Sequence, residues 1–198
     1  MDNLDYIQNY LKSSLDVKNK LSSDPSIINS IKDAAELIER TYRDEKKLIL
    51  AGNGGSAGDA QHIAAEFVSR FFYDRPGLPA IAITTDTSML TAIGNDYGFT
   101  KLFSRQVQAQ GVPGDVFIGI STSGNSENII AAVNEAKNKG LHTIALCGSG
   151  GQLASMVDIP IGVPSDSTPH IQECHIVIGH IICGLVEERI FPDEKPDE

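Results

Sequence analysis

Five short apolar runs, separated by helical stretches, are the sequence feature that most restricts the fold. They read LILAG, AIAIT, VFIGI, TIALC and DIPIGV, at residues 48–52, 80–84, 116–120, 143–147 and 158–163. Turn-forming Gly, Ser or Thr residues follow each run within a few positions, and most runs then lead into a helical pattern. Short strands that alternate with helices are typical of a parallel sheet. We therefore expect an α/β fold, doubly wound, with a five-stranded parallel sheet flanked by helices.

Two amphipathic helices precede the first of these runs. Apolar residues recur with helical spacing from Leu4 to about Leu21, and again from Ile27 to Ile38. The break between them, SSDPS, supplies a capping residue and a proline, both of which helix N-termini favour. Such an N-terminal helical pair suits a surface between subunits or packing on the chain's own sheet, and the pattern favours neither.

The length of 198 residues fits one domain with a single core. Within it we expect the helical pair at residues 1–44, the α/β core at 45–191 and a frayed acidic tail at 192–198. No apolar stretch approaches the roughly 18 residues of a membrane span, and the N-terminus lacks the pattern of an export signal. We therefore expect a cytoplasmic protein with no membrane partner.

Charge and cysteine content narrow the partners. A net charge of -10 argues against nucleic acid, because duplex binding depends on cations that neutralise phosphates. If the ligand is an anion, the net negative charge of the protein repels it, so backbone N–H groups and a few local cations must hold it. Cys147, Cys174 and Cys183 form no CxxC pair, so we interpret them as small apolar residues in a reducing compartment.

Two polar loops follow the first and third runs: GNGGS at residues 52–56 and STSGNSEN at residues 121–128. Glycines let the backbone approach a ligand, and the N–H groups that begin the next helix lack intrahelical partners, so each loop suits an anion. Ser and Asn also cap helices in turns of no functional interest. With the strand order 2-1-3-4-5, however, both loops meet at the crevice where α/β sheets bind ligands. Neither loop matches GxxxxGK[ST], the phosphate loop of nucleotide hydrolases, or GxGxxG, the dinucleotide-binding motif, so both of these functions have weak support.

His62 and Glu66 stand four residues apart after the first loop, on one face of the expected helix. Such a pair can share a divalent metal or act as acid and base, although it is also common on solvated helix faces. Arg70 lies one turn further on the same stripe, where it would orient Glu66, touch an anion or form a surface ion pair.

The segment STPHIQECHIVIGHIICGLVEER predicts a C-terminal helix that starts at its TP and contains His170, Gln172, His175 and His180. Its expected core stripe is Ile171, Cys174, Val177, Ile178, Ile181 and Leu185. A buried histidine bonded to a carbonyl is commoner than a histidine ligand. Gln172 and His180 are eight residues apart, roughly 12 Å along a helix, so they reach one metal only with extended side chains or another subunit's help.

Taken together, these segments resemble the phosphoheptose isomerases, which belong to the sugar isomerase (SIS) family. The resemblance covers nearly the whole chain and rests on GNGGSAGDAQHIAAEF, DTSMLTAIGNDYGF, FSRQV, STSGNSENI and TPHIQECHIVIGHIICGLVE. It implies a five-stranded sheet in flavodoxin-like order, a homotetramer, and interconversion of the phosphorylated seven-carbon sugars sedoheptulose 7-phosphate and D-glycero-D-manno-heptose 7-phosphate. That reaction would be the first step toward nucleotide-activated heptose for surface glycans.

The resemblance also assigns roles to residues. It implies that Glu66 and His180 transfer the proton, and that one Zn²⁺ per subunit is held by His62, Glu66, Gln172 and His180. The substrate contacts that it implies are Asn53, Gly54, Gly55, Ser56, Glu66, Asn95, Asp96, Ser121, Thr122, Ser123, Ser126 and Gln172, of which the serines and threonine from 121 to 126 hold the phosphate. A carboxylate bound to zinc is a poorer base, so the metal role and the base role of Glu66 compete.

Two residues set limits on the resemblance. His170 stands where the family frequently has arginine, and Gly58 lies early in the helix of His62, at a cost of roughly 1 kcal/mol relative to alanine. Two other functions stay open: a non-catalytic SIS tetramer that binds the replication initiator, and an isomerase of another sugar phosphate. A fold alone does not determine function. The presence of all four residues of the expected metal set favours the enzyme, because a binding module has no need of that set.

Overall fold

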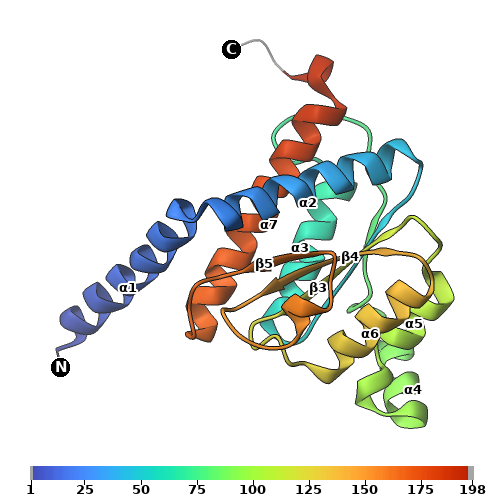
Figure 1. The fold of residues 1–198 in the computed structure, drawn as a ribbon, viewed down its shortest axis with the longest axis horizontal. Helices are drawn as coiled ribbons and strands as arrows, with labels where there is room; N and C mark the ends of the chain where they lie inside the picture. The colour runs from blue at the N-terminus through green and yellow to red at the C-terminus, as the bar shows by residue number, and fades with distance from the viewer. Residues whose placement is uncertain (1, 196–198) are drawn as a thin grey trace.

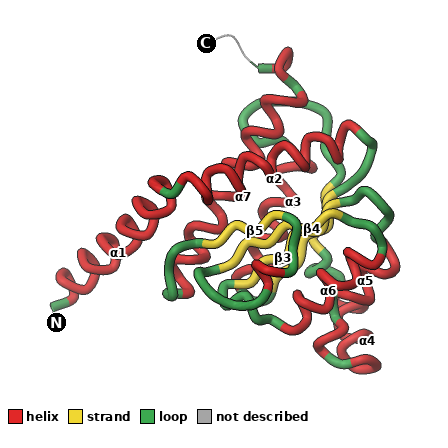
Figure 2. The backbone as a smooth tube through the Cα atoms, in the orientation of Figure 1, coloured by secondary structure: helices red, strands yellow, loops and turns green. Residues whose placement is uncertain are grey.

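The computed structural model describes residues 2–195, which form a five-stranded parallel sheet between two layers of helices (Figures 1 and 2). The strands are β1 (Leu48–Gly52), β2 (Ala80–Ala82), β3 (Val116–Ser121), β4 (His142–Cys147) and β5 (Ile159–Gly162). Their order across the sheet is β2-β1-β3-β4-β5, and each neighbouring pair is parallel. The predicted α/β class and strand order are therefore confirmed.

Helices account for most of the remaining described residues. The α-helices are α1 (Asn3–Ser23), α2 (Pro25–Arg43), α3 (Gly55–Val68), α4 (Thr87–Tyr97), α5 (Ser104–Gln110), α6 (Glu127–Asn138) and α7 (Thr168–Ile190). Short 3-10 helices are η1 (Phe99–Lys101), η2 (Leu153–Ser155) and η3 (Pro192–Glu194). The expected acidic tail thus begins with η3, and its residues 196–198 lie outside the described part of the chain. No helix within residues 2–195 has both the length and the apolarity to cross a bilayer.

Each face of the sheet has its own hydrophobic core. One core joins the strands to α2, α3 and α7, and the other joins them to α4, α5 and α6. Because helices cover both faces, the central strands β1 and β3 are buried at every position, which explains their continuous apolar sequence. Leu50 of β1 pairs with Ile118 of β3, which pairs with Ile144 of β4.

The predicted break between the first two helices is confirmed. Asp24 is the N-cap of α2, where its side chain accepts hydrogen bonds from the backbone N–H groups of Ser26 (2.9 Å) and Ile27 (3.4 Å). Pro25 follows as the first helical residue, where its missing N–H costs nothing.

The two helices of the N-terminal pair behave differently. The apolar face of α2 is buried in the core, whereas α1 extends away from the body of the molecule (Figure 1). Several of the apolar side chains of α1 are exposed in the single chain: Leu4, Tyr6, Ile7, Leu11 and Leu15. Packing on the chain's own core is therefore confirmed for α2, while a subunit surface on α1 stays a prediction.

The expected core stripe of α7 is partly wrong. Ile171, Cys174 and Ile178 are buried, but Val177 and Ile181 are 37% and 41% exposed. Their places in the core are taken by Ile182, Cys183 and Val186. The stripe is displaced because α7 packs between α2 and α3 as well as on the sheet, so it buries a wider face than a single apolar row.

Candidate active site

The two polar loops lie side by side, because they follow the neighbouring strands β1 and β3. Their side chains are joined directly: the Asn53 and Asn128 amides each donate an N–H to the other's carbonyl oxygen, at 2.9 Å in both directions. Asn128 is only 2% exposed. The sequence places Asn128 at the end of the second loop but contains no signal for this pairing across 75 residues. This pair of hydrogen bonds fixes the two loops relative to each other.

The backbone of the first loop is compact. Gly54 has φ +55 and is the N-cap of α3, a conformation that favours glycine. The Ser56 N–H donates to the carbonyl of Asn53 (3.0 Å), and the Ser56 side chain is buried. The Ala57 N–H likewise donates to the carbonyl of Gly54 (3.1 Å), so these first N–H groups of α3 are used within the turn. The turn itself lies where β1 ends, at the carboxyl edge of the sheet.

The second loop presents its hydroxyls around the N-terminus of α6. The Ser121 and Ser126 hydroxyl oxygens are 2.9 Å apart, and Ser126 is the N-cap residue of α6 without using its side chain as a cap. Ser123 is exposed and accepts the Asn125 N–H at 3.2 Å, while Thr122 is half-buried. This concentration of hydroxyl and N–H donors suits a phosphate without a nearby cation.

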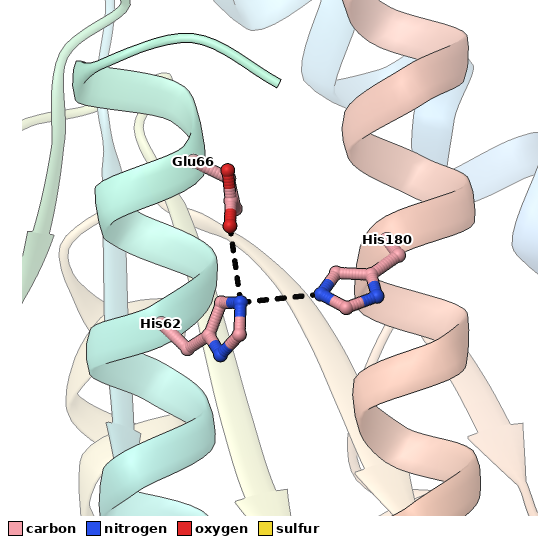
Figure 3. Close-up of side chains that lie close together, drawn as sticks. All are labelled: His62, Glu66 and His180. Carbon is pink, nitrogen blue, oxygen red and sulfur yellow. Dashed lines mark hydrogen bonds and ion pairs between the residues drawn. The ribbon is translucent and has the colours of Figure 1, made fainter. Parts of the chain in front are cut away.

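Helices α3 and α7 run side by side in the same direction, and this arrangement assembles the rest of the site (Figure 3). Three contacts lie at nearly the same sequence offset: Gly55 with Gln172, His62 with His180, and Ile63 with Gly179. The approach is close at Gly179, where a Cβ would lie 2.7 Å from the Ile63 side chain. Glycine at this position lets the two helices bring their polar residues into contact.

His62, Glu66 and His180 form a cluster between these helices. The Nε2 atom of His62 is 3.0 Å from Glu66 Oε1 and 3.2 Å from His180 Nε2 (Figure 3). One ligand atom from each of the three residues lies within 4.8 Å of the others. A lone i, i+4 pair on α3 is weak evidence of a site, but the third residue comes from 118 positions later in the chain.

The cluster fits a divalent cation. Both contacts use one atom of His62, and a nitrogen that donates its proton to Glu66 has no lone pair left for a proton from His180. A single Nε2–H of His62 would have to be shared between the two contacts, whereas three ligand atoms within 4.8 Å of one another are also typical of a metal site. Two imidazoles and one carboxylate are a donor set that Zn²⁺ uses in catalytic sites with an open position. Asp59 lies about one turn before His62 on α3. Burial raises the pKa of the Asp59 carboxyl, and the nearby His62 lowers it by a smaller amount.

Gln172 does not join this cluster within one chain. Its amide nitrogen lies 2.6 Å from the place where a Cβ on Gly55 would be, at the start of α3. His180 is eight residues further along α7, about 12 Å away along the helix axis. Gln172 therefore lies beside the first loop, where its amide can face a sugar hydroxyl, and its role as a metal ligand stays a prediction.

Asn95 and Asp96 are also apart from the cluster. Both are exposed on α4, where the Asn95 amide donates to Asp96 Oδ1 at 2.8 Å. Helix α4 belongs to the core on the opposite face of the sheet from α3 and α7. Their contact with a substrate stays a prediction.

The expectation for Arg70 is wrong in its geometry. Helix α3 ends at Val68, so Arg70 does not continue the stripe of His62 and Glu66. Its side chain is exposed and has no hydrogen bond or ion pair with any described residue. The arginine that contacts this part of α3 is Arg75, which donates to the backbone carbonyl of Glu66 at 2.8 Å. Nothing in the sequence pattern singles out Arg75, because its partners are backbone carbonyls and the side chain of Glu187, 112 residues away.

The histidines of α7 have three separate environments. His175 is fully buried and its Nε2–H donates to the Cys147 carbonyl (3.2 Å); burial lowers its pKa to about 4. His170 is buried with its ring 4.7 Å from that of Tyr10 on α1, and its Nδ1 is 3.6 Å from Glu173. Only His180 joins the cluster with His62 and Glu66. The interpretation of a buried histidine held by a carbonyl is thus confirmed for His175.

Glu173 anchors α1 to α7 beside this site. It accepts hydrogen bonds from Ser14, Lys18 (3.1 Å) and Tyr10 (3.0 Å) on α1. These donors, Ser14 first, lower the pKa of Glu173 to about 2. These contacts hold the middle of α1, from Tyr10 to Lys18, against α7. The three cysteines are buried and free, as the interpretation of small apolar residues predicts.

Comparison with known proteins identifies the family of the chain. The SIS domain family model matches residues 9–148. The chain is 58% identical over 188 residues to the phosphoheptose isomerase of Aneurinibacillus thermoaerophilus, covering 94% of this chain and 95% of that protein. It superposes on a phosphoheptose isomerase structure from Francisella tularensis with a TM-score of 0.90 and 40% identity, covering 95% of this chain and 100% of the other. It also superposes on a phosphoheptose isomerase structure from Neisseria gonorrhoeae with a TM-score of 0.88 and 42% identity, covering 94% of this chain and 100% of the other.

Proposed function

The chain belongs to the SIS domain family and to its phosphoheptose isomerases, and from this premise we propose that Glu66 and His180 interconvert sedoheptulose 7-phosphate and D-glycero-D-manno-heptose 7-phosphate. The observation that supports these roles is the meeting of a carboxylate and an imidazole from distant helices beside two loops rich in N–H and hydroxyl donors. The same chemistry makes the protein an aldose–ketose isomerase.

The reaction moves one proton between C1 and C2 through an enediol, so it needs a base at carbon and an acid at oxygen. Glu66 suits the base, because Oε1 contacts His62 while Oε2 has no hydrogen bond within residues 2–195. His180 suits the acid, because an imidazole both donates and accepts protons near neutral pH. In this assignment His62 holds Glu66 and His180 at contact distance.

The shape of the site suits an extended sugar phosphate. The phosphate would occupy the hydroxyl-rich second loop, with Ser121, Thr122, Ser123 and Ser126 as its donors. The sugar would pass Asn53, Gly54, Gly55, Ser56 and Gln172 at the start of α3. His62 lies seven residues after Gly55 on α3, about 10 Å along the helix axis. Carbons C1 and C2 of an extended sugar would therefore reach the cluster while its phosphate stays in the second loop.

We propose Zn²⁺ as the cofactor, one per subunit. His62, Glu66 and His180 would hold it. Gln172, the fourth ligand that the resemblance implies, would reach it only with an extended side chain or from another subunit. When bound, such a cation would polarise the substrate carbonyl and stabilise the negative charge of the enediolate. The Oε1 atom of Glu66 contacts His62, and its other oxygen would stay available to the substrate carbon, which would reduce the competition between its two roles.

We further propose a cytoplasmic homotetramer. The exposed apolar face of α1 and the exposed Val177 and Ile181 of α7 provide surface for subunit contacts. A neighbouring subunit would also explain how Asn95 and Asp96 serve a site on the other face of the sheet. Three buried, unpaired cysteines suit a reducing compartment.

The deciding experiment is incubation with sedoheptulose 7-phosphate, with the aldoheptose phosphate followed by NMR, with and without added Zn²⁺. We expect turnover that chelation reduces and Zn²⁺ restores. Absence of turnover with Zn²⁺ supplied would contradict the enzyme assignment and favour a non-catalytic binding module. Faster turnover of another ketose phosphate would keep the chemistry and change the substrate.

A further inference from the structure

We propose that Arg75 and Glu187 form a clamp that sets the position of Glu66 relative to His180, which makes both of them positioning residues for proton transfer. The clamp is the ion pair between Arg75 Nε and Glu187 Oε1, at 2.9 Å. This inference rests on the proposed function, because it concerns the same reacting pair.

The burial of the clamp shows that geometry is its main contribution. Both side chains are only 1% exposed. Removing two charges from water offsets much of their attraction, so a pair buried this deeply contributes little more stability than apolar residues of the same size. What apolar residues would not supply is a set of directed hydrogen bonds.

Those hydrogen bonds hold the end of α3 and the turn after it. Arg75 donates to the backbone carbonyls of Glu66 (2.8 Å), Phe67 (2.6 Å) and Ser69 (3.1 Å). The last carbonyls of a helix have no intrahelical partner, so one guanidinium provides donors that the helix itself lacks. The backbone of the proposed base is thus bonded directly to the clamp.

Glu187 makes the matching connection to His180. It accepts the backbone N–H groups of Phe71 (2.8 Å) and Phe72 (2.7 Å), and the Phe71 ring centroid lies 5.5 Å from that of His180. Glu187 also lies seven residues after His180 on α7, two turns along the same face. One carboxylate therefore ties together the helix of the acid, the ring beside it and the arginine that holds the base.

The chain contains a matched control at the other end of the sheet. Asp115, whose side chain is fully buried, accepts the backbone N–H groups of Lys47 (3.1 Å) and Val112 (3.0 Å) and pairs with Lys47 Nζ at 2.6 Å. Like Glu187, it is a buried carboxylate with two backbone donors and one cation. Because it lies where β1 and β3 begin, it has no contact with α3 or α7 at the site.

The test compares the double variant Arg75→Met/Glu187→Gln, which leaves no unpaired buried charge, with Asp115→Asn in steady-state kinetics on sedoheptulose 7-phosphate. We expect the clamp variant to lose kcat by about 100-fold, the effect of a misplacement near 1 Å, with KM nearly unchanged because the phosphate loop is intact. Asp115→Asn should lower thermal stability and leave kcat at the wild-type value. A kcat loss of similar size in both variants, or in neither, would overturn the proposal.

A second measurement does not depend on turnover. The imidazole ¹⁵N resonances of His62 and His180 report their contact at 3.2 Å, and they should shift in the clamp variant but not in Asp115→Asn. Failure of the wild type to isomerise the sugar would count against the proposed function alone, since the resonances still test the clamp. If the double variant does not fold, Arg75→Lys keeps the buried charges paired but loses the several carbonyl contacts, and wild-type kcat and resonances in that variant would refute the clamp.

Discussion

Gly179→Ala tests whether the close approach of α3 and α7 creates the active site. An added Cβ would lie 2.7 Å from two carbons of Ile63, and ordinary contact begins at 3.4 Å, so the helices or the Ile63 side chain must move by about 0.7 Å. If α7 moves, the 3.2 Å contact between His62 and His180 lengthens beyond hydrogen-bond range. Such a shift should lower kcat by about 10- to 100-fold.

The stability effect of this substitution combines two opposing terms. Alanine in a helix gains about 1 kcal/mol over glycine, and overpacking costs about 1–3 kcal/mol. Gly58→Ala on α3 is the control, because nothing lies within 4 Å of its added Cβ. Steady-state kinetics and thermal unfolding would be measured for both variants. We expect Gly58→Ala to raise the free energy of unfolding by up to about 1 kcal/mol with normal kcat. Wild-type kcat in Gly179→Ala would refute the role assigned to the helix approach.

Three further predictions concern other parts of the site. Glu66→Gln and His180→Gln should each reduce isomerisation by about 10²–10⁴-fold with the oligomer intact, and near-normal rates by NMR would contradict their catalytic roles. Asn128→Ala removes both hydrogen bonds to Asn53, so it should lower the free energy of unfolding by about 2 kcal/mol and raise KM, and a double-mutant cycle with Asn53→Ala should show coupling rather than additivity. Because the folded pKa of His175 lies near 4, below its unfolded value of 6.5, its contribution to stability is complete above pH 6.5 and is lost as pH falls toward 4, by at most about 3 kcal/mol; equilibrium unfolding of His175→Gln should lack this loss.

Most of the fold could be predicted from local patterns. The five apolar runs match the five strands, and the 2-1-3-4-5 order places the two polar loops on neighbouring strands. The cap at Asp24 and the proline after it mark the start of α2 correctly. These features depend on residues within one turn or one strand, so the sequence carries their signal directly.

The site was predictable only in part. His62 and Glu66 are visible as a pair, but their contact with His180 depends on the parallel packing of α3 and α7. The same packing leaves Gln172 at the start of α3, two turns from the cluster. Arg70, which the helical stripe favoured, lies beyond the end of α3.

The set of elements, their order and the types of chemical group after each strand follow from the sequence alone, because periodicity and turn chemistry act over a few residues. Which distant groups meet depends on how those elements pack in three dimensions. Asn53 with Asn128, Arg75 with Glu187 and His62 with His180 are separated by 75, 112 and 118 residues. The first pair meets because β1 and β3 are neighbours, whereas His62 meets His180 through the register of α3 against α7. That register results from side-chain volumes, such as the missing Cβ of Gly179 beside Ile63, and no short segment of the chain encodes it.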